Sequence, residues 1–185
     1  RYEHRHDWRR AGPSRGHTES PNGSDVNSVS WDELRMVMAG VTSVNGSGSA
    51  DGLVRNLDRG AQERLGQPPV EYDTFPLDDG GGELFATGCD GYSSDRTSAS
   101  DIADLDAYTP HLGEGIDAET RNEFLCQREG EFDLVEPQTA IIHGVGVLAR
   151  DVAEMADTRT TLIWSPRTNI FLYGDTARVT LYDNL

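Results

Sequence analysis

The chain has 185 residues, and its 32 Asp and Glu residues outnumber 16 basic residues, all of them Arg, for a formal net charge of −16. An acidic surface of this kind repels nucleic acids and anionic membranes, so neither is an expected partner. The sequence contains no run of about eighteen apolar residues, so no membrane span is expected. It also shows no charged start followed by an apolar segment, so no secretory signal is expected.

The acidity has two interpretations, an ordinary acidic protein or adaptation to high salt. Under the second, carboxylate repulsion loosens the fold in dilute buffer, and salt relieves it because the Debye length falls to about 3 Å at 1 M. We therefore expect the melting temperature to rise as KCl increases from dilute to molar. A melting temperature that is flat or falls over that range would count against salt adaptation.

The two cysteines, Cys89 and Cys126, are too few for a disulfide framework and fit a reducing compartment. With no secretory signal in the sequence, we expect a cytoplasmic protein.

Residues 1–28 are polar, rich in Arg and interrupted by Pro and Gly, which predicts an irregular segment. His4 and His6 form an H-x-H pair of the kind that can bind a metal. No apolar strand precedes them, however, so we expect both to be solvated loop residues, and His17 as well.

The next segment predicts a helix followed by a strand. Ser30 and Glu33 have the spacing of a capping box, and Gly40 suits the position just after a helix that ends at Met38. Residues 41–44 are β-prone. Apolar residues spaced by four then predict a crossover helix over residues 53–65.

Residues 70–77 predict the next strand, and residues 78–104 are rich in Gly, Ser and Asp. This second stretch is either a flexible surface insert or an irregular βα unit around residues 84–89. The βα unit is favoured, because a parallel strand that follows needs a crossover connection.

Three further elements predict parallel strands that alternate with helices. Residues 105–112 form a strand that bears His111, and Asp117 caps the helix after it. Residues 140–142 form a strand that ends on His143, a helix with Val152 on its apolar face follows, and residues 160–164 form another strand. This alternation predicts a parallel α/β barrel with polar residues at the carboxyl ends of its strands, where sites are built.

The candidate site residues suit metal-assisted hydrolysis. His111 offers a metal ligand, and Glu114, three residues later, offers a carboxylate that can move a proton. The alternative is a surface His-Leu-Gly-Glu loop. His143 is either a neutral core histidine or a residue that faces the mouth of the barrel.

Two stretches, TAIIHGVGVLARDVAEMADTRTTLIWSPRTNIFLYG (residues 139–174) and DAYTPHLGEGIDAETRNEFLC (residues 106–126), resemble the amidohydrolase superfamily in its cytosine and guanine deaminase-like branch. The resemblance implies that residues 29–185 form a partial (β/α)8 barrel, roughly its second to seventh strands, preceded by the polar segment 1–28. It implies an aminohydrolase that cleaves C–N bonds of a small, ring-type substrate with a divalent metal, Zn²⁺ or alternatively Fe²⁺. The site residues it implies are His111 and His143 as metal ligands, Glu114 and His143 as catalytic residues, and Arg167, Thr168 and Asn169 as substrate-binding residues.

The chain also departs from that superfamily. It has no Lys, which argues against the branch that bridges two metals with a carbamylated Lys. The resemblance places an H-x-H strand before residue 1 and a final Asp after residue 185, so we expect the chain to be an inactive fragment of an enzyme. The rival hypothesis is a non-catalytic, barrel-derived binding or scaffold protein, and a homo-oligomer is compatible with either.

Overall fold

We describe the chain from a computed structural model, which places residues 1–9, 25–46, 50, 52–59 and 65–184. The chain divides into two compact units: one comprises Arg1–Glu19, Asp73–Asp104 and Tyr108–Leu185, and the other Ser20–Tyr72 and Leu105–Ala107. No helix in the described part of the chain is long and apolar enough to cross a bilayer. In chain order the elements are α1 (His6–Arg9), α2 (Val26–Met38), β1 (Ser43–Val44), β2 (Arg55–Asn56), β3 (Glu71–Asp73), α3 (Ala99–Ile102), β4 (Tyr108–Leu112), α4 (Ala118–Leu125), the 3-10 helix η1 (Gly130–Phe132), β5 (Ala140–His143), α5 (Ala149–Thr158), β6 (Thr161–Ile163), α6 (Pro166–Leu172) and α7 (Val179–Tyr182).

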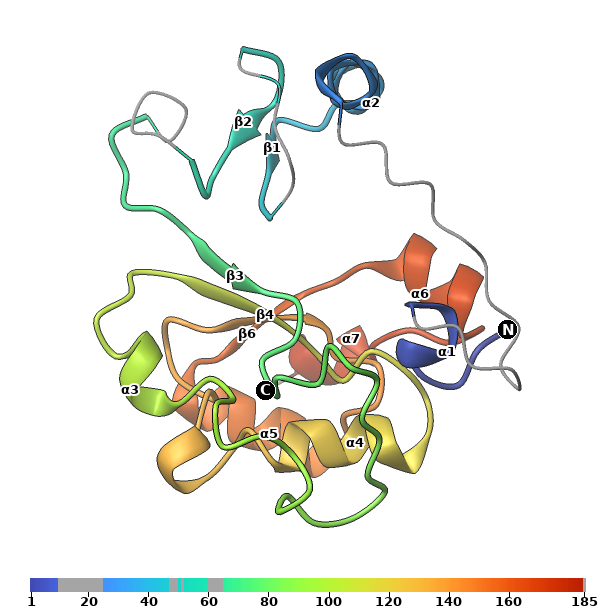
Figure 1. Cartoon of the computed structure of the whole chain (residues 1–185), viewed down its shortest axis with the longest axis vertical. Coiled ribbons are helices and arrows are strands. Elements are labelled where there is room, and N and C mark those ends of the chain that lie inside the picture. The colour runs from blue at the N-terminus through green and yellow to red at the C-terminus, as the bar shows by residue number, and fades with distance from the viewer. Residues whose placement is uncertain (10–24, 47–49, 51, 60–64, 185) are drawn as a thin grey trace. The chain divides into compact units, whose positions relative to one another are not determined.

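Strands β4, β5 and β6 organise the larger unit; they belong to a sheet with the order β3-β4-β5-β6, in which only Asp73 of β3 belongs to the larger unit. β5 pairs in parallel with both β4 and β6, and Leu112 on β4 lies opposite His143 on β5. Helices α4 and α5 lie side by side on one face of this sheet (Figure 1), joined by an Arg121–Asp151 ion pair of 3.1 Å. The predicted α/β class with parallel strands is therefore confirmed.

Local signals in this unit act as the sequence predicts. The Asp117 carboxylate accepts a hydrogen bond of 2.8 Å from the backbone N–H of Thr120, which fixes the start of α4. Phe124 on that helix and Val152 and Met155 on α5 are fully or almost fully buried. They belong to one core cluster: Leu77, Tyr92, Leu112, Phe124, Cys126, Val135, Ile141, Val147, Val152 and Met155.

In the smaller unit, α2 begins earlier than predicted. Asp25 is the N-cap, and its carboxylate accepts hydrogen bonds from the backbone of Asn27 and Ser28. Ser30 instead donates its hydroxyl to the carbonyl of Val26 one turn back. The end of the helix is as predicted, because Gly40 follows the C-cap with φ of +88°.

Two predicted regular elements, the helix over residues 53–65 and the βα unit around residues 84–89, do not form. The described part of residues 53–65 forms strand β2 and turns instead of a helix, and residues 60–64 lie outside the described residues. Within residues 78–98 the chain forms turns and bends with no strand at 84–89, and α3 is the one helix between β3 and β4. The connection between these two strands is therefore mostly irregular and lacks the predicted βα unit around residues 84–89.

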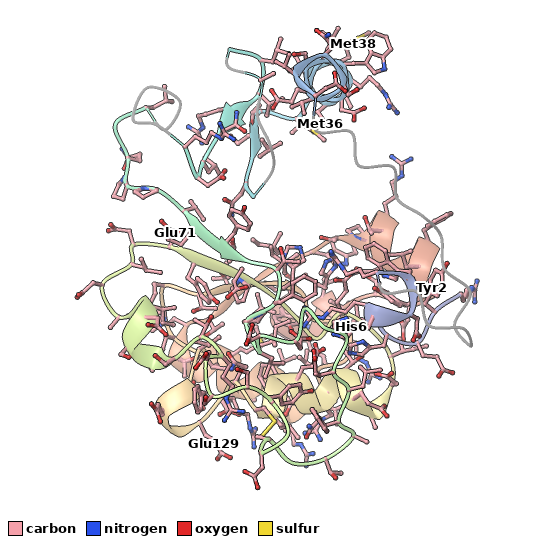
Figure 2. The ribbon with its side chains drawn as sticks, viewed as in Figure 1. Tyr2, His6, Met36, Met38, Glu71 and Glu129 are labelled. Carbon is pink, nitrogen blue, oxygen red and sulfur yellow. A yellow bond between two sulfur atoms is a disulfide. The ribbon has the colours of Figure 1, made fainter. Side chains whose placement is uncertain are left out.

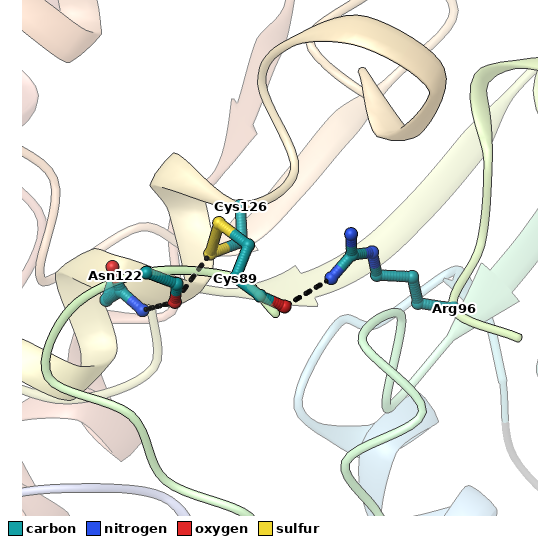
Figure 3. Close-up of a disulfide and its surroundings, with 5 residues drawn as sticks. Cys89, Arg96, Asn122 and Cys126 are labelled. Carbon is teal, nitrogen blue, oxygen red and sulfur yellow. Dashed lines mark hydrogen bonds between the residues drawn. A yellow bond between two sulfur atoms is a disulfide. The ribbon is translucent and has the colours of Figure 1, made fainter. Parts of the chain in front are cut away.

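The cysteines also correct a prediction, because Cys89 and Cys126 form a disulfide across 37 residues (Figure 3). Asn122 donates to the carbonyl of Gly88 at 2.8 Å, and Arg96 donates to the carbonyl of Cys89 at 2.8 Å. The disulfide thus ties the irregular loop to the end of α4. The small number of cysteines did not exclude a disulfide, since a single disulfide needs only two cysteines.

We expect reduction of this disulfide to lower the free energy of unfolding by about 3–4 kcal/mol, because the bridge restricts a long loop in the unfolded chain. Urea denaturation followed by circular dichroism, with and without reductant, measures the change. The double variant with Cys89→Ser and Cys126→Ser should have the denaturation midpoint of the reduced protein, and reductant should not change that midpoint. Equal midpoints for oxidised and reduced protein would contradict the prediction.

Candidate functional site

Most of the predicted site residues meet where β4 and β5 end. His111 lies on β4, Glu114 lies in the turn just after it, and His143 ends β5. The imidazole rings of His111 and His143 have centroids 5.3 Å apart, and His143 Nε2 lies 3.5 Å from Glu114 Oε2. Asn169 reaches the group from α6, because its Oδ1 is 2.7 Å from His143 Nδ1.

The other two predicted residues of the Ser-Pro-Arg-Thr-Asn motif do not join this group. Arg167 and Thr168 lie on the exposed side of α6, whereas Asn169 is completely buried. Their contact with a substrate stays a prediction, and Asn169 holds His143 in place.

The backbone around the site is unusual at both strand ends. His143 has φ of +80°, a conformation that costs a non-glycine residue of order 1–3 kcal/mol. After β4, a Cβ on Gly115 would lie 2.5 Å from the carbonyl oxygen of Glu3, so no side chain fits there. Strain of this kind persists where the surrounding structure enforces it, and it gathers at functional sites.

Glu114 is a buried carboxylate, 1 % exposed, in a mostly cationic setting. The Tyr173 hydroxyl donates to its Oε1 at 2.9 Å, and the Trp8 indole N–H donates to that hydroxyl at 2.9 Å. Burial acts to raise the pKa of Glu114, but the charges of His143, Arg9 and Arg5 and the bond from Tyr173 outweigh it and lower the pKa. Glu114 is therefore ionised at neutral pH and able to accept a proton.

His111 is a neutral imidazole with one free nitrogen. Burial is the largest effect on it and lowers its pKa to about 4. Its Nδ1 lies 3.3 Å from the carbonyl oxygen of Asp73. Since a carbonyl only accepts, the ring proton is on Nδ1, and Nε2 keeps the lone pair that a metal ligand needs.

His143 is oriented in the same manner. Its Nδ1 donates to the Asn169 amide oxygen, and its Nε2 faces Glu114. That Nε2 has a lone pair when the imidazole is neutral and a proton when it is charged. Glu114 Oε2 is buried and makes no hydrogen bond. Arg9 Nη2 and His143 Nε2 each lie 3.5 Å from that oxygen, and the His111 ring lies beside the His143 ring, but the ligand atoms of His111, Glu114 and His143 do not all lie within 4.8 Å of one another. Imidazole and carboxylate groups are ligand types that suit Zn²⁺ or Fe²⁺.

Arg5 holds this region together, and the sequence interpretation missed it. Its side chain is completely buried and donates to the carbonyls of Thr74 at 2.8 Å and His111 at 3.0 Å. Its backbone N–H donates to the carbonyl of Glu114 at 3.1 Å. The residue therefore positions the backbone on both sides of the β4 end.

The expectation that His4 and His6 are solvated is wrong. They are 0 % and 3 % exposed, and Figure 2 places His6 among the side chains of the larger unit. Among the described residues, one group of three metal-binding side chains has ligand atoms within 4.8 Å of one another, and it consists of His4, His6 and Glu123. The H-x-H spacing was the available signal; the missing information was the long-range partner. His17 lies outside the described residues.

A cavity of about 670 Å³ lies elsewhere in the larger unit, between α5, β6 and α7. Val152, Leu162 and Tyr182 contribute to its lining, and none of the predicted site residues does. Comparison of the chain with protein-family models, with curated proteins and with solved structures finds no match. Function therefore has to be argued from the side chains at the strand ends.

Proposed function

We propose that the chain carries the chemical centre of a metal-dependent hydrolase of C–N bonds, an aminohydrolase that acts on a small amino-substituted ring or a related amidine. The observation that carries the proposal is the buried Glu114 carboxylate, whose Oε2 lacks a hydrogen bond and lies 3.5 Å from His143 Nε2. His111 lies beside them with a lone pair on Nε2.

The order of the four-stranded sheet supports a partial barrel as the scaffold, whereas β1 and β2, which were expected to belong to the same barrel, form a separate two-stranded sheet. In the order β3-β4-β5-β6 each strand neighbours the next one in sequence, as in a (β/α)8 barrel and unlike a doubly wound sheet, where the order reverses. His111 and His143 lie at or near the carboxyl ends of neighbouring strands, which is where barrel enzymes place catalytic side chains.

The proposed chemistry assigns a role to each side chain. A divalent metal held by His111 and His143 would supply a water whose pKa is about 7. Glu114, ionised and shielded from solvent, accepts a proton at Oε2 and returns it to the leaving nitrogen. With its Nδ1 bonded to Asn169, His143 has only Nε2 left for the metal, so negative charge that develops in the reaction would be stabilised by the metal ion and not by a separate hydrogen bond from His143.

Two neighbours position these groups without touching the substrate. Tyr173 holds Glu114 Oε1, so Oε2 is the oxygen available for proton transfer. Asn169 holds His143 Nδ1, so Nε2 faces the reaction. The strained backbone of His143 and the unbonded oxygen of Glu114 cost stability, which is expected of a site shaped by chemistry more than by packing.

The test is release of ammonia. The chain, and any longer natural polypeptide that contains it, are freed of metal, reloaded with Zn²⁺ and incubated with a panel of aminated heterocycles and amidines. Zinc-dependent ammonia release from at least one compound is the expected result. A fully zinc-loaded polypeptide that releases none would overturn the proposal and favour the scaffold alternative.

A further inference from the structure

The geometry points to a second divalent-metal site, formed by His4, His6 and Glu123 and distinct from the His111–His143 centre. One ligand atom of each residue lies within 4.8 Å of one atom of each of the others. Nothing in this inference depends on the proposed hydrolase activity. The site would take a metal of the zinc class, because two imidazoles and one carboxylate match Zn²⁺, Co²⁺ or Fe²⁺ better than Mg²⁺ or Ca²⁺.

The first argument is the number of buried ligand atoms without hydrogen bonds. His4 and Glu123 are 0 % exposed, and His6 is 3 % exposed. Buried atoms without hydrogen bonds include His4 Nε2, His6 Nδ1 and both carboxylate oxygens of Glu123. Buried polar atoms in native proteins almost always have partners, and a bound ion is one of the explanations when they do not.

The second argument is distance. His4 Nε2 lies 2.9 Å from Glu123 Oε1, yet the pair lacks the direction of a hydrogen bond. Two ligands at about 2.1 Å from one zinc ion, separated by an angle of about 90–110°, lie about 3.0–3.4 Å apart. A shift of a few tenths of an ångström therefore suffices for both atoms to bind the same ion.

The third argument is the support behind His6. Its Nε2 lies 2.7 Å from Asp79 Oδ2, and a carboxylate only accepts, so Nε2 carries the ring proton. Its Nδ1 then has the lone pair and no partner, the arrangement in which a carboxylate orients a metal-bound imidazole. At His4, binding through Nε2 requires the long hydrogen bond of 3.2 Å from the His6 N–H to Nδ1 to open.

The fourth argument is charge. Arg5 contributes one positive charge beside the negative charges of Asp79 and Glu123, at 3.3 Å from Glu123 Oε1. With both imidazoles neutral, the cluster has a net charge of −1, so it attracts a cation. A divalent ion and two imidazole protons bring the same charge, and they compete for the same nitrogens.

The experiment is a titration of the chelator-treated full chain with Zn²⁺ and with Co²⁺ near pH 7.5, followed by calorimetry, metal analysis and the cobalt absorption spectrum. We expect Glu123→Gln and His6→Gln each to remove one equivalent of metal. Asp79→Asn should weaken the same equivalent about 10–100-fold, as loss of a supporting carboxylate does. A double variant with His111→Gln and His143→Asn should keep it, which separates this site from the hydrolase centre.

Glu119→Gln is the matched control, because it makes the same change on the same helix, α4. If Glu123→Gln and His6→Gln bind as many equivalents as tightly as wild type, the site does not exist. Nitrogen NMR of the histidine rings in the wild-type chain gives an answer even if a variant fails to fold. Zinc should shift the His4 and His6 nitrogens, and unshifted signals at saturating zinc would overturn the inference.

Discussion

Replacing Glu114 with Gln is expected to lower the rate of C–N hydrolysis by the metal-loaded protein about 10²–10⁴-fold, the usual contribution of a general acid–base group. Gln has nearly the same shape, so it can still accept the Tyr173 hydroxyl bond of 2.9 Å. It cannot accept the proton from water, because an amide is not a base near neutral pH. The loss should therefore fall on kcat more than on KM.

Kinetics with the substrate found in the ammonia assay, at equal zinc content, measure this change. Glu131→Gln makes the same substitution at an exposed position and should leave the rate unchanged. Tyr173→Phe removes only the bond that positions Oε1, so it should reduce kcat less and shift the acid limb of the pH–rate profile to higher pH, since that bond helps to lower the Glu114 pKa. A Glu114→Gln protein that hydrolyses at the wild-type rate would remove Glu114 from the mechanism.

Where a sequence signal is local, the structure follows it. Asp117 caps α4 because its own carboxylate reaches the first turn of that helix, and this needs no distant partner. The apolar run at residues 140–142 becomes β5, and the run at residues 160–164 becomes β6, because each is short and β-prone between polar segments. Two competing local caps are harder to rank: Asp25 starts α2 because it binds two backbone N–H groups, which leaves Ser30 inside the helix.

The predicted helix over residues 53–65 failed for a different reason. A spacing of four places residues on one face of a helix, but it is also an even number and places them on one face of a strand. A tertiary contact decides between the two. The buried Glu33 carboxylate accepts the backbone N–H groups of Ala50 at 3.0 Å and Val54 at 3.3 Å, so this segment is held as a loop leading into β2.

The candidate site was predictable in part, because some of its residues lie at the ends of strands that the sequence indicates. His111, Glu114 and His143 follow apolar strands, and parallel pairing brings the ends of those strands together.

His4 and His6 follow no strand. His4 is buried against Glu123, 119 positions away in the chain, and His6 against Asp79, 73 positions away, which periodicity cannot reveal. Their H-x-H spacing was visible, but burial depended on partners that spacing does not name.

Arg5→Met is expected to lower the free energy of unfolding by about 3–5 kcal/mol, the range found when one partner of a buried ion pair is removed. Met keeps an apolar stem of similar length but leaves Asp79 and Glu123, both 0 % exposed, without their cation. It also removes the donors that hold the carbonyls of Thr74 and His111. Arg5→Lys keeps the charge but not the planar fork, so its loss should be intermediate.

Urea denaturation followed by circular dichroism measures these changes, and Arg35→Met is the matched control. Arg35 pairs with Asp32 on the surface of α2, at 3.3 Å and with both side chains at least 60 % exposed, so its loss should cost less than about 0.5 kcal/mol. Adding Glu123→Gln to Arg5→Met should recover part of the lost stability, because it removes a charge that the first change left unpaired. An Arg5→Met protein as stable as Arg35→Met would show that solvent or another group already compensates these carboxylates, and Arg5 would then lose its role as the residue that holds the β4 end.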